Sequence, residues 1–388
     1  MDFLQHELEQ LERDGLLRRT IAWPQAGGRI ELDDGRMLLN FSSNDYLGLS
    51  KDPYVKQRAI EALERWGCGA TASRLMCGTL DLHEELEAAL ARLVDGEAAL
   101  VFSSGFGMNV GVVAALAGRD DVIFSDRLIH ASLIDGARLS RAEIKPFAHN
   151  DVEALKHLLE STPCRGRRLI VTESVFSMDG DLAPLEEIHA LAVQHQAKVL
   201  VDEAHAIGVW GDGGGACRRL SRTARPDFTA GTLGKALGSM GGFIVCSQVS
   251  REFLINRSRS FIFATALSPA CLGAALGSIE RIGQDPGMGE RLFERARAFH
   301  GMLTAEGFRL PEFHSQIIPV LIGENEAALE LARRLRECGL LATAIRPPTV
   351  PKGTARLRLS VTLSHEIQDL QWAAGQIGLA AREMGLVA

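Results

Sequence analysis

One lysine stands in a glycine-rich stretch of the chain, residues 231–242. Lys235 follows Gly234 and precedes Ala236. Read alone, the segment is explained by a surface lysine in a flexible loop. The chemical interpretation is a lysine whose amine forms a Schiff base with a flat cofactor, because small neighbours leave room for a ring. Such chemistry needs an acidic partner elsewhere in the chain.

The candidate partner follows a short apolar run at residues 199–201. Asp202 ends this run and His205 comes three residues later. Ligands of open α/β sheets bind beyond the carboxyl ends of the strands. An acid in that place can keep a pyridine nitrogen protonated, which makes the ring an electron sink. A strand-end acid that only caps a loop is the alternative that the residues leave open.

The same four residues, Asp202-Glu-Ala-His205, also form a motif of nucleic-acid motors. A motor would need a phosphate loop of the form G-x-x-x-x-G-K-[ST] upstream of the acid. Lys235 lies downstream, is followed by Ala236 and lacks the first glycine of that pattern. The sequence therefore argues against a motor.

Two further segments could complete a cofactor site. Gly105 and Phe106 stand between an apolar run at 98–102 and a helical pattern at 108–116. Backbone N–H groups at the start of a helix bind phosphate well. His130 opens another predicted helix after a strand. A lone histidine is more often structural, but an imidazole at this edge of a sheet could stack on a flat ring.

The elements that must position these residues alternate between strand and helix. Short runs without alternation suit strands that are buried on both faces of a parallel sheet. Helical segments lie between them, so the fold class is α/β with a large, mostly parallel sheet. The predicted strands are residues 98–102, 122–124, 169–171 and 199–201, and residues 184–195 form one of the predicted helices.

Three regions are expected along the chain. Residues 1–48 form an N-terminal arm, with a helix over 3–19 and a hairpin around Asp33-Asp34-Gly35-Arg36. Residues 49–284 form the large α/β domain. Residues 285–388 form a smaller α+β domain, whose expected helices cover 289–306, 326–338 and the end of the chain from about 365, and whose expected strands cover 317–322, 341–345 and 356–361.

Composition excludes several classes of protein. The 388 residues carry 42 Lys and Arg against 49 Asp and Glu, a net charge of −7, and show no basic run, so a nucleic-acid partner is not expected. Seven scattered cysteines without a C-x-x-C pair predict neither a metal site nor a disulfide framework. The sequence shows no apolar leader and no membrane span, so we expect a cytoplasmic protein.

Taken together, these motifs resemble the pyridoxal-phosphate enzymes of the aspartate-aminotransferase fold (fold type I), and more narrowly the α-oxoamine synthases. The resemblance runs from about residue 40 to 364 and implies a homodimer with active sites at the interface. It is carried by residues 40–48 (Asn-Phe-Ser-Ser-Asn-Asp-Tyr-Leu-Gly), 104–106, 130–132, 172–180 (Thr-Glu-Ser-Val-Phe-Ser-Met-Asp-Gly), 202–205 and 232–235. Residues 147–151 (Phe-Ala-His-Asn-Asp) also fit one branch of the family.

The resemblance also implies roles for single residues. Lys235 would hold pyridoxal 5'-phosphate and later take the Cα proton of the amino acid, while Asp202 would pair with the pyridine nitrogen. His130 would stack on the ring and contact substrate. The remaining cofactor contacts would be His205 at the phenolic oxygen, Ser177 nearby, the backbone of Gly105 and Phe106, Thr232 at the phosphate, and Thr265 at the phosphate of the neighbouring subunit.

Residues 343–358 are similar to the branch of this family that works in biotin biosynthesis. That likeness implies L-alanine and a pimeloyl thioester, on coenzyme A or acyl carrier protein, as substrates. Arg346 would bind the amino-acid carboxylate, with Thr349 and Arg18 also contacting substrate, although an exposed helix arginine explains Arg18 equally well. Arg356 and Arg358 are read as the solvated face of a strand.

Two alternatives remain open at this point. A sister synthase of the family would use glycine or serine with another acyl-CoA. A non-catalytic pyridoxal-phosphate-binding regulator would carry an additional DNA-binding domain, but the 94 residues before the α/β alternation show no helix-turn-helix with a basic face.

Overall fold

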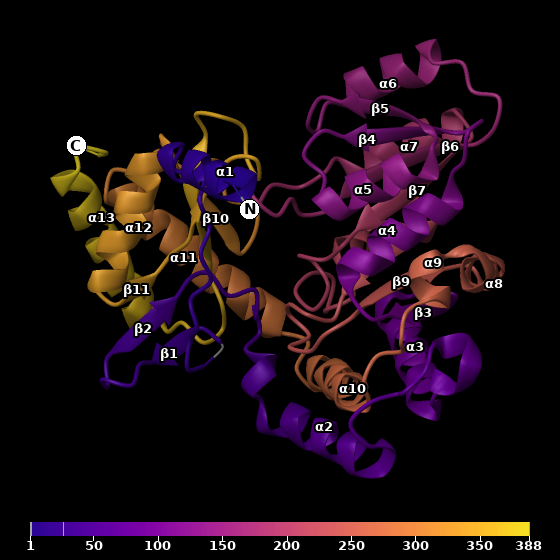
Figure 1. Ribbon diagram of the computed structural model, residues 1–388, viewed down its shortest axis with the longest axis horizontal. Coiled ribbons are helices and arrows are strands. Elements are labelled where there is room, and N and C mark those ends of the chain that lie inside the picture. Colours follow the sequence, from indigo (N-terminus) through magenta and orange to yellow (C-terminus); the bar gives the residue numbers. More distant parts are fainter. Residues whose placement is uncertain (1, 26, 388) are drawn as a thin grey trace. The chain divides into compact units, whose positions relative to one another are not determined.

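The chain folds into two units, which the computed structural model describes over residues 2–25 and 27–387 (Figure 1). The large unit contains residues 49–177 and 181–290. The other, here called the C-terminal unit, contains residues 1–48, 178–180 and 291–388. Residues 178–180 therefore belong to the C-terminal unit, while the chain on both sides of them belongs to the large unit.

The large unit is organised around a seven-stranded sheet in the order β3-β9-β8-β7-β6-β4-β5. Strands β8, β7, β6, β4 and β5 are parallel, whereas β9 is antiparallel to both β8 and β3. The mostly parallel α/β sheet confirms the predicted fold class. The strands are β3 (Ala98–Phe102), β4 (Val122–Asp126), β5 (Glu143–Phe147), β6 (Arg168–Glu173), β7 (Ala197–Asp202), β8 (Phe228–Thr232) and β9 (Gly242–Cys246).

Both faces of this sheet are covered by helices. On β7, Leu200 packs into one apolar cluster with residues of α4, α5, α8 and α9, while Val199 and Val201 pack into another with residues of α6 and α7. Apolar side chains on both faces explain why the central strands lack an alternating pattern. The helices of the unit are α2 (Pro53–Trp66), α3 (Asp81–Val94), α4 (Gly105–Leu116), α5 (Ala131–Ser140), α6 (Val152–Ser161), α7 (Leu185–Gln194), α8 (Gln248–Arg257), α9 (Arg259–Ile262) and α10 (Pro269–Gln284).

The C-terminal unit combines two small sheets with helices. One sheet has the order β1-β2-β11 and the other β10-β13-β12. The Phe41 ring, which follows β2, stacks on Phe299 of α11 with ring centroids 5.1 Å apart, so the N-terminal arm shares this unit's core. Its elements are α1 (Asp2–Arg13), β1 (Arg29–Glu31), β2 (Met37–Asn40), α11 (Met288–Ala305), β10 (Ile317–Gly323), α12 (Asn325–Glu337), β11 (Leu340–Leu341), β12 (Ala344–Ile345), β13 (Ala355–Ser360) and α13 (Ile367–Glu383).

Two expected elements differ from those observed. The helix predicted over 3–19 ends at Arg13, because Gly15 takes a left-handed conformation (φ 63°) that stops it. The strand predicted over 341–345 is two short strands, because β11 pairs with β2 while β12 pairs with β13. The arm hairpin is confirmed, with Ile30 opposite Leu38.

The described residues contain neither a membrane-spanning helix nor a metal-binding cluster. None of their helices is both long enough and apolar enough to span a lipid bilayer. Nor do their His, Cys, Asp and Glu side chains gather in groups of three that could hold a metal ion.

Gly231 on β8 is packed so closely that a side chain would not fit. A Cβ atom there would lie 2.4 Å from the ring of Phe243 on the neighbouring strand β9. We predict that Gly231→Ala lowers the free energy of unfolding by about 1–3 kcal/mol, the usual cost of overpacking a core. Denaturant unfolding followed by circular dichroism measures this change.

Gly283→Ala is the matched control, because Gly283 is exposed near the end of α10 and a Cβ atom there meets nothing within 4 Å. The added methyl group should leave stability unchanged or raise it by about 0.4–1 kcal/mol. Equal stabilities for the two variants would contradict the packing described for Gly231.

Candidate active site

The site lies where three adjacent parallel strands end. Strands β6, β7 and β8 finish at Glu173, Asp202 and Thr232, and the register places Glu173 beside Asp202 and Asp202 beside Ala230. Carboxyl ends of parallel strands meet at one edge of a sheet. Two carboxyl groups and a hydroxyl group therefore gather at this edge.

Lys235 and His205 lie side by side at this edge. The Lys235 Nζ atom lies 2.7 Å from the Nε2 atom of His205. Lys235 reaches this place from the turn after β8, and His205 from the turn after β7. His205 is buried and Lys235 is half-buried. The structure thus brings together two residues that the sequence separates by thirty positions.

Asp202 belongs to a hydrogen-bonded chain that sequence reasoning missed. Asn109 of α4 donates from Nδ2 to Asp202 Oδ2 at 2.7 Å and to the Ser132 hydroxyl at 3.0 Å. The Ser132 hydroxyl lies 2.7 Å from His130 Nδ1. The chain Asp202–Asn109–Ser132–His130 fixes the carboxylate and the imidazole relative to each other. One signal was present in the sequence, since Asn109 is a polar residue inside a strongly apolar helix.

His130 starts α5 and accepts a hydrogen bond from the backbone N–H of Ser132. Its ring meets the Phe106 ring edge-on, with centroids 6.4 Å apart. Although part of the residue is exposed, desolvation lowers the pKa of His130, and the charge of Lys235 acts in the same direction against the opposing effect of Asp202. A neutral imidazole at neutral pH suits stacking on a ring and accepting or donating one hydrogen bond.

Glu173 is a second residue that sequence reasoning did not assign. Its side chain is buried, and Oε1 has no hydrogen-bond partner in the described structure. Burial raises the pKa of Glu173 to about 8 and the neighbouring Asp202 carboxylate adds to this rise, while Lys235 and backbone hydrogen bonds at His130 and Ser177 oppose it. Glu173 is therefore mostly protonated at neutral pH.

These side chains enclose a cavity of about 160 Å³, here called the strand-edge cavity. The first turn of α4 forms one wall, and the Gly231 backbone contributes to another. Helix N-termini offer N–H groups and a partial positive charge to an anion. The lining residues are Gly105, Phe106, Met108, Asn109, His130, Ser132, Glu173, Asp202, Ala204, His205, Gly231, Thr232 and Lys235.

Ser177 and Thr265 are placed differently. Neither is among the described residues that line the strand-edge cavity. Ser177 is buried, and its backbone hydrogen-bonds Glu173. Thr265 is exposed in the segment after α9 and pairs with Ser73 in an isolated β-bridge. Their predicted cofactor contacts remain predictions.

The three predicted substrate-binding residues gather in the C-terminal unit. Arg18, Arg346 and Thr349 line a groove of about 620 Å³, here called the arginine groove. The Arg346 guanidinium donates to the Gly15 carbonyl, and its buried Nε atom has no partner in the described structure. Burial lowers the pKa of Arg346, and the neighbouring Arg18 charge lowers it further. An unpaired donor beside a second cation suits a carboxylate ligand.

Two interpretations of charged residues were wrong. Arg356 and Arg358 on β13 are only 7% exposed and do not form a solvated face. Arg356 pairs with Asp179, and Arg358 donates to Asn44 Oδ1 at 3.1 Å and to the Tyr46 hydroxyl at 3.2 Å. The alternation of arginine and leucine along β13 suggested one exposed face, but both faces of this strand are buried.

Comparison with known proteins agrees with this fold and site. The family description "Aminotransferase class I and II" matches residues 36–377. An 8-amino-7-oxononanoate synthase of Geobacter sulfurreducens is 46% identical over 98% of both chains, and one of Trichlorobacter lovleyi is 44% identical over 100% of both. A serine palmitoyltransferase from S. paucimobilis, solved with a bound PLP-myriocin aldimine, superposes with a TM-score of 0.93 at 35% identity, covering 100% of this chain and 98% of that one. An 8-amino-7-oxononanoate synthase from Francisella tularensis superposes with a TM-score of 0.77 at 28% identity, covering 91% of this chain and 100% of that one.

The chain belongs to the aminotransferase class I and II family and is a pyridoxal-phosphate-dependent enzyme of fold type I. The alternative of a non-catalytic regulator is therefore set aside. The strand-edge cavity fits this cofactor on its own chemistry, because it joins a lysine amine, a strand-end carboxylate and a helix N-terminus. The particular proteins to which it is 44–46% identical over its full length are named 8-amino-7-oxononanoate synthases.

We predict that Lys235→Ala abolishes the covalent attachment of the cofactor, because Lys235 is the lysine whose amine lines the cavity. Borohydride reduction followed by peptide mass spectrometry locates the attachment. Lys198→Ala is the control, since Lys198 pairs with Asp227 at the opposite end of β7 from Asp202. Reducible cofactor on another lysine of Lys235→Ala would contradict the assignment.

Proposed function

We propose that this protein condenses L-alanine with a pimeloyl thioester to give 8-amino-7-oxononanoate, CO2 and a free thiol, a reaction of biotin biosynthesis. In this reaction a carbon–carbon bond forms between the alanine Cα and the acyl carbonyl carbon. The carbon–sulfur bond of the thioester breaks, and the bond from Cα to the alanine carboxylate breaks with loss of CO2. The leaving group is the thiol of coenzyme A or of an acyl carrier protein.

The observation that carries this proposal is the placement of Lys235 and His205 2.7 Å apart in a cavity that also holds Asp202 and His130. A base, an acid partner and a stackable ring are the groups that carbanion chemistry at an amino-acid Cα requires. The full-length identity of 46% and 44% to named 8-amino-7-oxononanoate synthases supports the choice of substrates.

Pyridoxal phosphate, when bound, supplies an electron sink for the negative charge that develops at Cα. The residues of the chain divide the remaining work. Asp202, fixed by Asn109, would pair with the ring nitrogen and keep it protonated, and His205 would hydrogen-bond the phenolic oxygen. Lys235 Nζ takes the proton from Cα and later returns one, acting as general base and then as general acid.

The substrate carboxylate is assigned to the arginine groove. Arg346 offers its partnerless Nε donor, and Thr349 lies beside it, with its backbone N–H donating to the Arg346 carbonyl at 3.1 Å. Arg18 donates to the Pro347 carbonyl at 3.3 Å and raises the positive potential of the groove. A guanidinium binds a carboxylate through two parallel N–H bonds, which fixes the orientation of the substrate.

A sister reaction is the second candidate. The serine palmitoyltransferase superposes more closely than the Francisella tularensis synthase, with TM-scores of 0.93 and 0.77. A synthase that uses serine or glycine with another acyl-CoA would keep the fold, the cofactor and Lys235. The higher sequence identity to 8-amino-7-oxononanoate synthases favours alanine.

The active enzyme is proposed to be a homodimer in which Thr265 of each subunit hydrogen-bonds the cofactor phosphate of the other. Its exposure in the single chain supports this assignment, because such a residue must be available to a partner. Full activity of a protein that sediments as a monomer under the conditions of the assay would contradict the dimer.

The proposed reaction predicts release of free thiol from pimeloyl-CoA in the presence of L-alanine. The assay compares L-alanine, glycine and L-serine with cofactor-loaded protein and follows the thiol with a chromogenic disulfide. Release with alanine alone supports the proposal. Release only with serine or glycine favours a sister synthase, and pimeloyl-acyl carrier protein replaces pimeloyl-CoA if no amino acid gives release.

We predict that Arg346→Ala weakens alanine binding, because the loss of a buried bidentate partner costs about 2–5 kcal/mol. That range corresponds to a rise in the alanine KM of about 30-fold or more. Arg309→Ala is the control, since Arg309 is an exposed arginine of the same unit. An unchanged alanine KM in Arg346→Ala would remove this residue from carboxylate binding.

A further inference from the structure

The segment that follows β6 forms a short hairpin, residues 174–183, here called the connecting hairpin. Val175 and Leu182 pair in an antiparallel bridge. The backbone N–H of Phe176 donates to the Asp181 carbonyl at 3.0 Å, and that of Ala183 donates to the Ser174 carbonyl at 3.1 Å. The hairpin begins directly after Glu173, so its register decides where the end of β6 and Ser177 are held.

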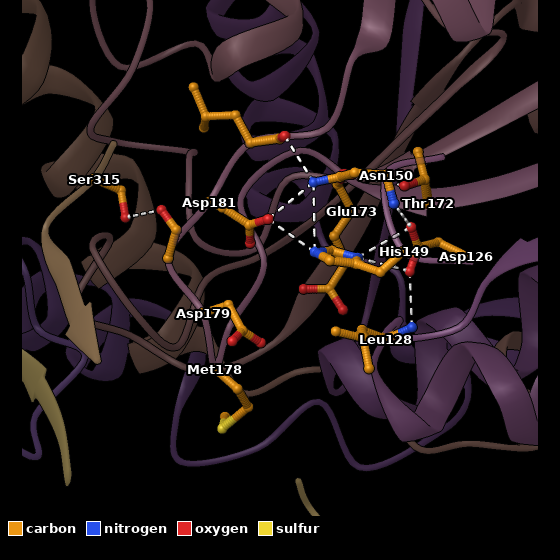
Figure 2. Close-up of polar contacts among 12 residues, drawn as sticks. Asp126, Leu128, His149, Asn150, Thr172, Glu173, Met178, Asp179, Asp181 and Ser315 are labelled. Carbon is orange, nitrogen blue, oxygen red and sulfur yellow. Dashed lines mark hydrogen bonds and ion pairs between the residues drawn. The ribbon is translucent and has the colours of Figure 1, made fainter. Parts of the chain in front are cut away.

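The tip of this hairpin, residues 178–180, packs within the C-terminal unit. Arg356 pairs with the Asp179 carboxylate. The Ser315 hydroxyl donates to the Gly180 carbonyl at 2.7 Å (Figure 2). Gly180 takes a left-handed conformation (φ 71°), and a Cβ atom there would lie 2.2 Å from the Ile317 carbonyl oxygen. The connecting hairpin is thus a covalent link between the two units, with its tip fixed in one and its base in the other.

The base is held by a charged cluster, here called the His149 clamp: Asp126, His149, Asn150 and Asp181. Asp126, the last residue of β4, lies 3.0 Å from His149 Nδ1, and Asp181 of the hairpin lies 2.8 Å from His149 Nε2 (Figure 2). Asn150 donates from its side chain to Asp181 at 2.9 Å and from its backbone to Asp126 at 2.8 Å. Two carboxylates on different elements are therefore joined through one imidazole.

The geometry requires both ring nitrogens of His149 to donate, since each faces an acceptor-only carboxylate. Burial by itself lowers the pKa of His149, but the hydrogen bonds and charges of Asp126 and Asp181 outweigh it and raise the pKa to about 10. These two carboxylates are the charged groups that face the ring among the described residues. Its other neighbours are the Asn150 amide and the edge of the Phe176 ring, 4.3 Å between centroids, which do not titrate.

The clamp acts on residues at the strand-edge cavity. Glu173 lines that cavity and accepts a hydrogen bond from the backbone of Ser177, the residue directly before the hairpin tip. A displacement of the hairpin would move the Ser177 N–H away from Glu173. It would thereby change the electrostatic interactions among the side chains of Glu173, Asp202 and Lys235. The sequence segment Phe147-Ala-His149-Asn-Asp151, which has no role in the mechanism above, thereby gains one.

We propose that His149 is a positioning residue, an imidazolium that ties Asp181 to Asp126 and so fixes the connecting hairpin and, through it, Ser177 and the Glu173 side chain that lines the strand-edge cavity. This inference rests on the placement of the cofactor beside Lys235 in the proposed function, and it does not depend on the identity of either substrate.

The sign of the pH dependence follows from the pKa shift. A histidine with a folded pKa near 10 and an unfolded pKa near 6.5 stabilises the fold fully below pH 6.5, and this contribution is lost as the pH rises through 10. In the native protein the hairpin should stay protected from pH 6.5 to about 9 and loosen near pH 10. In Asp181→Asn, which removes one carboxylate, the loosening should begin at lower pH.

The experiment measures hydrogen exchange of peptides from residues 174–183 by mass spectrometry, in the protein with and without cofactor, after correction for intrinsic exchange. Asp181→Asn should lose protection at least 10-fold by pH 8.5 and regain part of it at pH 6. The visible absorption band of the bound cofactor should show a shifted pH titration, because Glu173 and Ser177 have moved. His149→Gln, which is neutral at every pH, should lose protection without any pH dependence.

Asp121→Asn is the matched control, because Asp121 is a buried aspartate at the opposite end of β4 that bonds Arg167 at 2.8 Å. It should lower the melting temperature without altering hairpin exchange or the cofactor band. Equal effects of Asp121→Asn and Asp181→Asn, or a native hairpin whose protection is the same at pH 8 and pH 10.5, would overturn the proposal. These readouts need no acyl substrate, so a failure of thiol release contradicts the proposed function and leaves this inference intact.

Discussion

The arrangement of the large unit depends on one constraint, the common edge formed by the carboxyl ends of its parallel strands. Strands β4, β6, β7 and β8 end in Asp126, Glu173, Asp202 and Thr232. Helices cover both faces of the sheet, so the middle of each of these strands is mostly apolar, and each strand ends in a polar residue. The site and the His149 clamp are neighbouring parts of this one polar edge.

The same constraint gathers acids that would repel one another if all were ionised. Glu173 avoids this by its raised pKa, and Asp202 by the donors Asn109 and Ala204. Asp126 is neutralised by His149, which also reaches Asp181. Burying an ionised carboxylate is costly unless hydrogen-bond donors or an opposite charge surround it. Each acid at this edge is therefore either protonated or paired with such groups.

Not every acid beside the site takes part in it. Glu203, adjacent to Asp202, points away from the cavity and accepts the backbone N–H groups of Ala216 and Cys217 at 2.7 Å each. It thereby fixes the glycine-rich loop at 211–216. Alternation along a strand separates the two roles, since successive residues face opposite sides.

Much of the fold could be predicted from local patterns. The β-branched runs and the spacing of apolar residues gave the strands β4, β6 and β7 and the helices α4 and α7 within a few residues. The strands β8 and β9 were not predicted, and in β8 Gly231 interrupts the apolar pattern. The roles of Arg356 and Arg358 were misread for a related reason, because burial of charged side chains depends on partners far along the chain.

By itself, the sequence determined the residue types that the chemistry needs: a lysine among glycines, an acid and a histidine after an apolar strand, and a histidine at the start of a helix. Only the tertiary structure decided which of them meet. The partners of Asn109, Ser132, Glu173 and His149 could not be predicted from the local sequence, because a hydrogen bond or a pKa shift arises from groups that folding brings within about 3 Å.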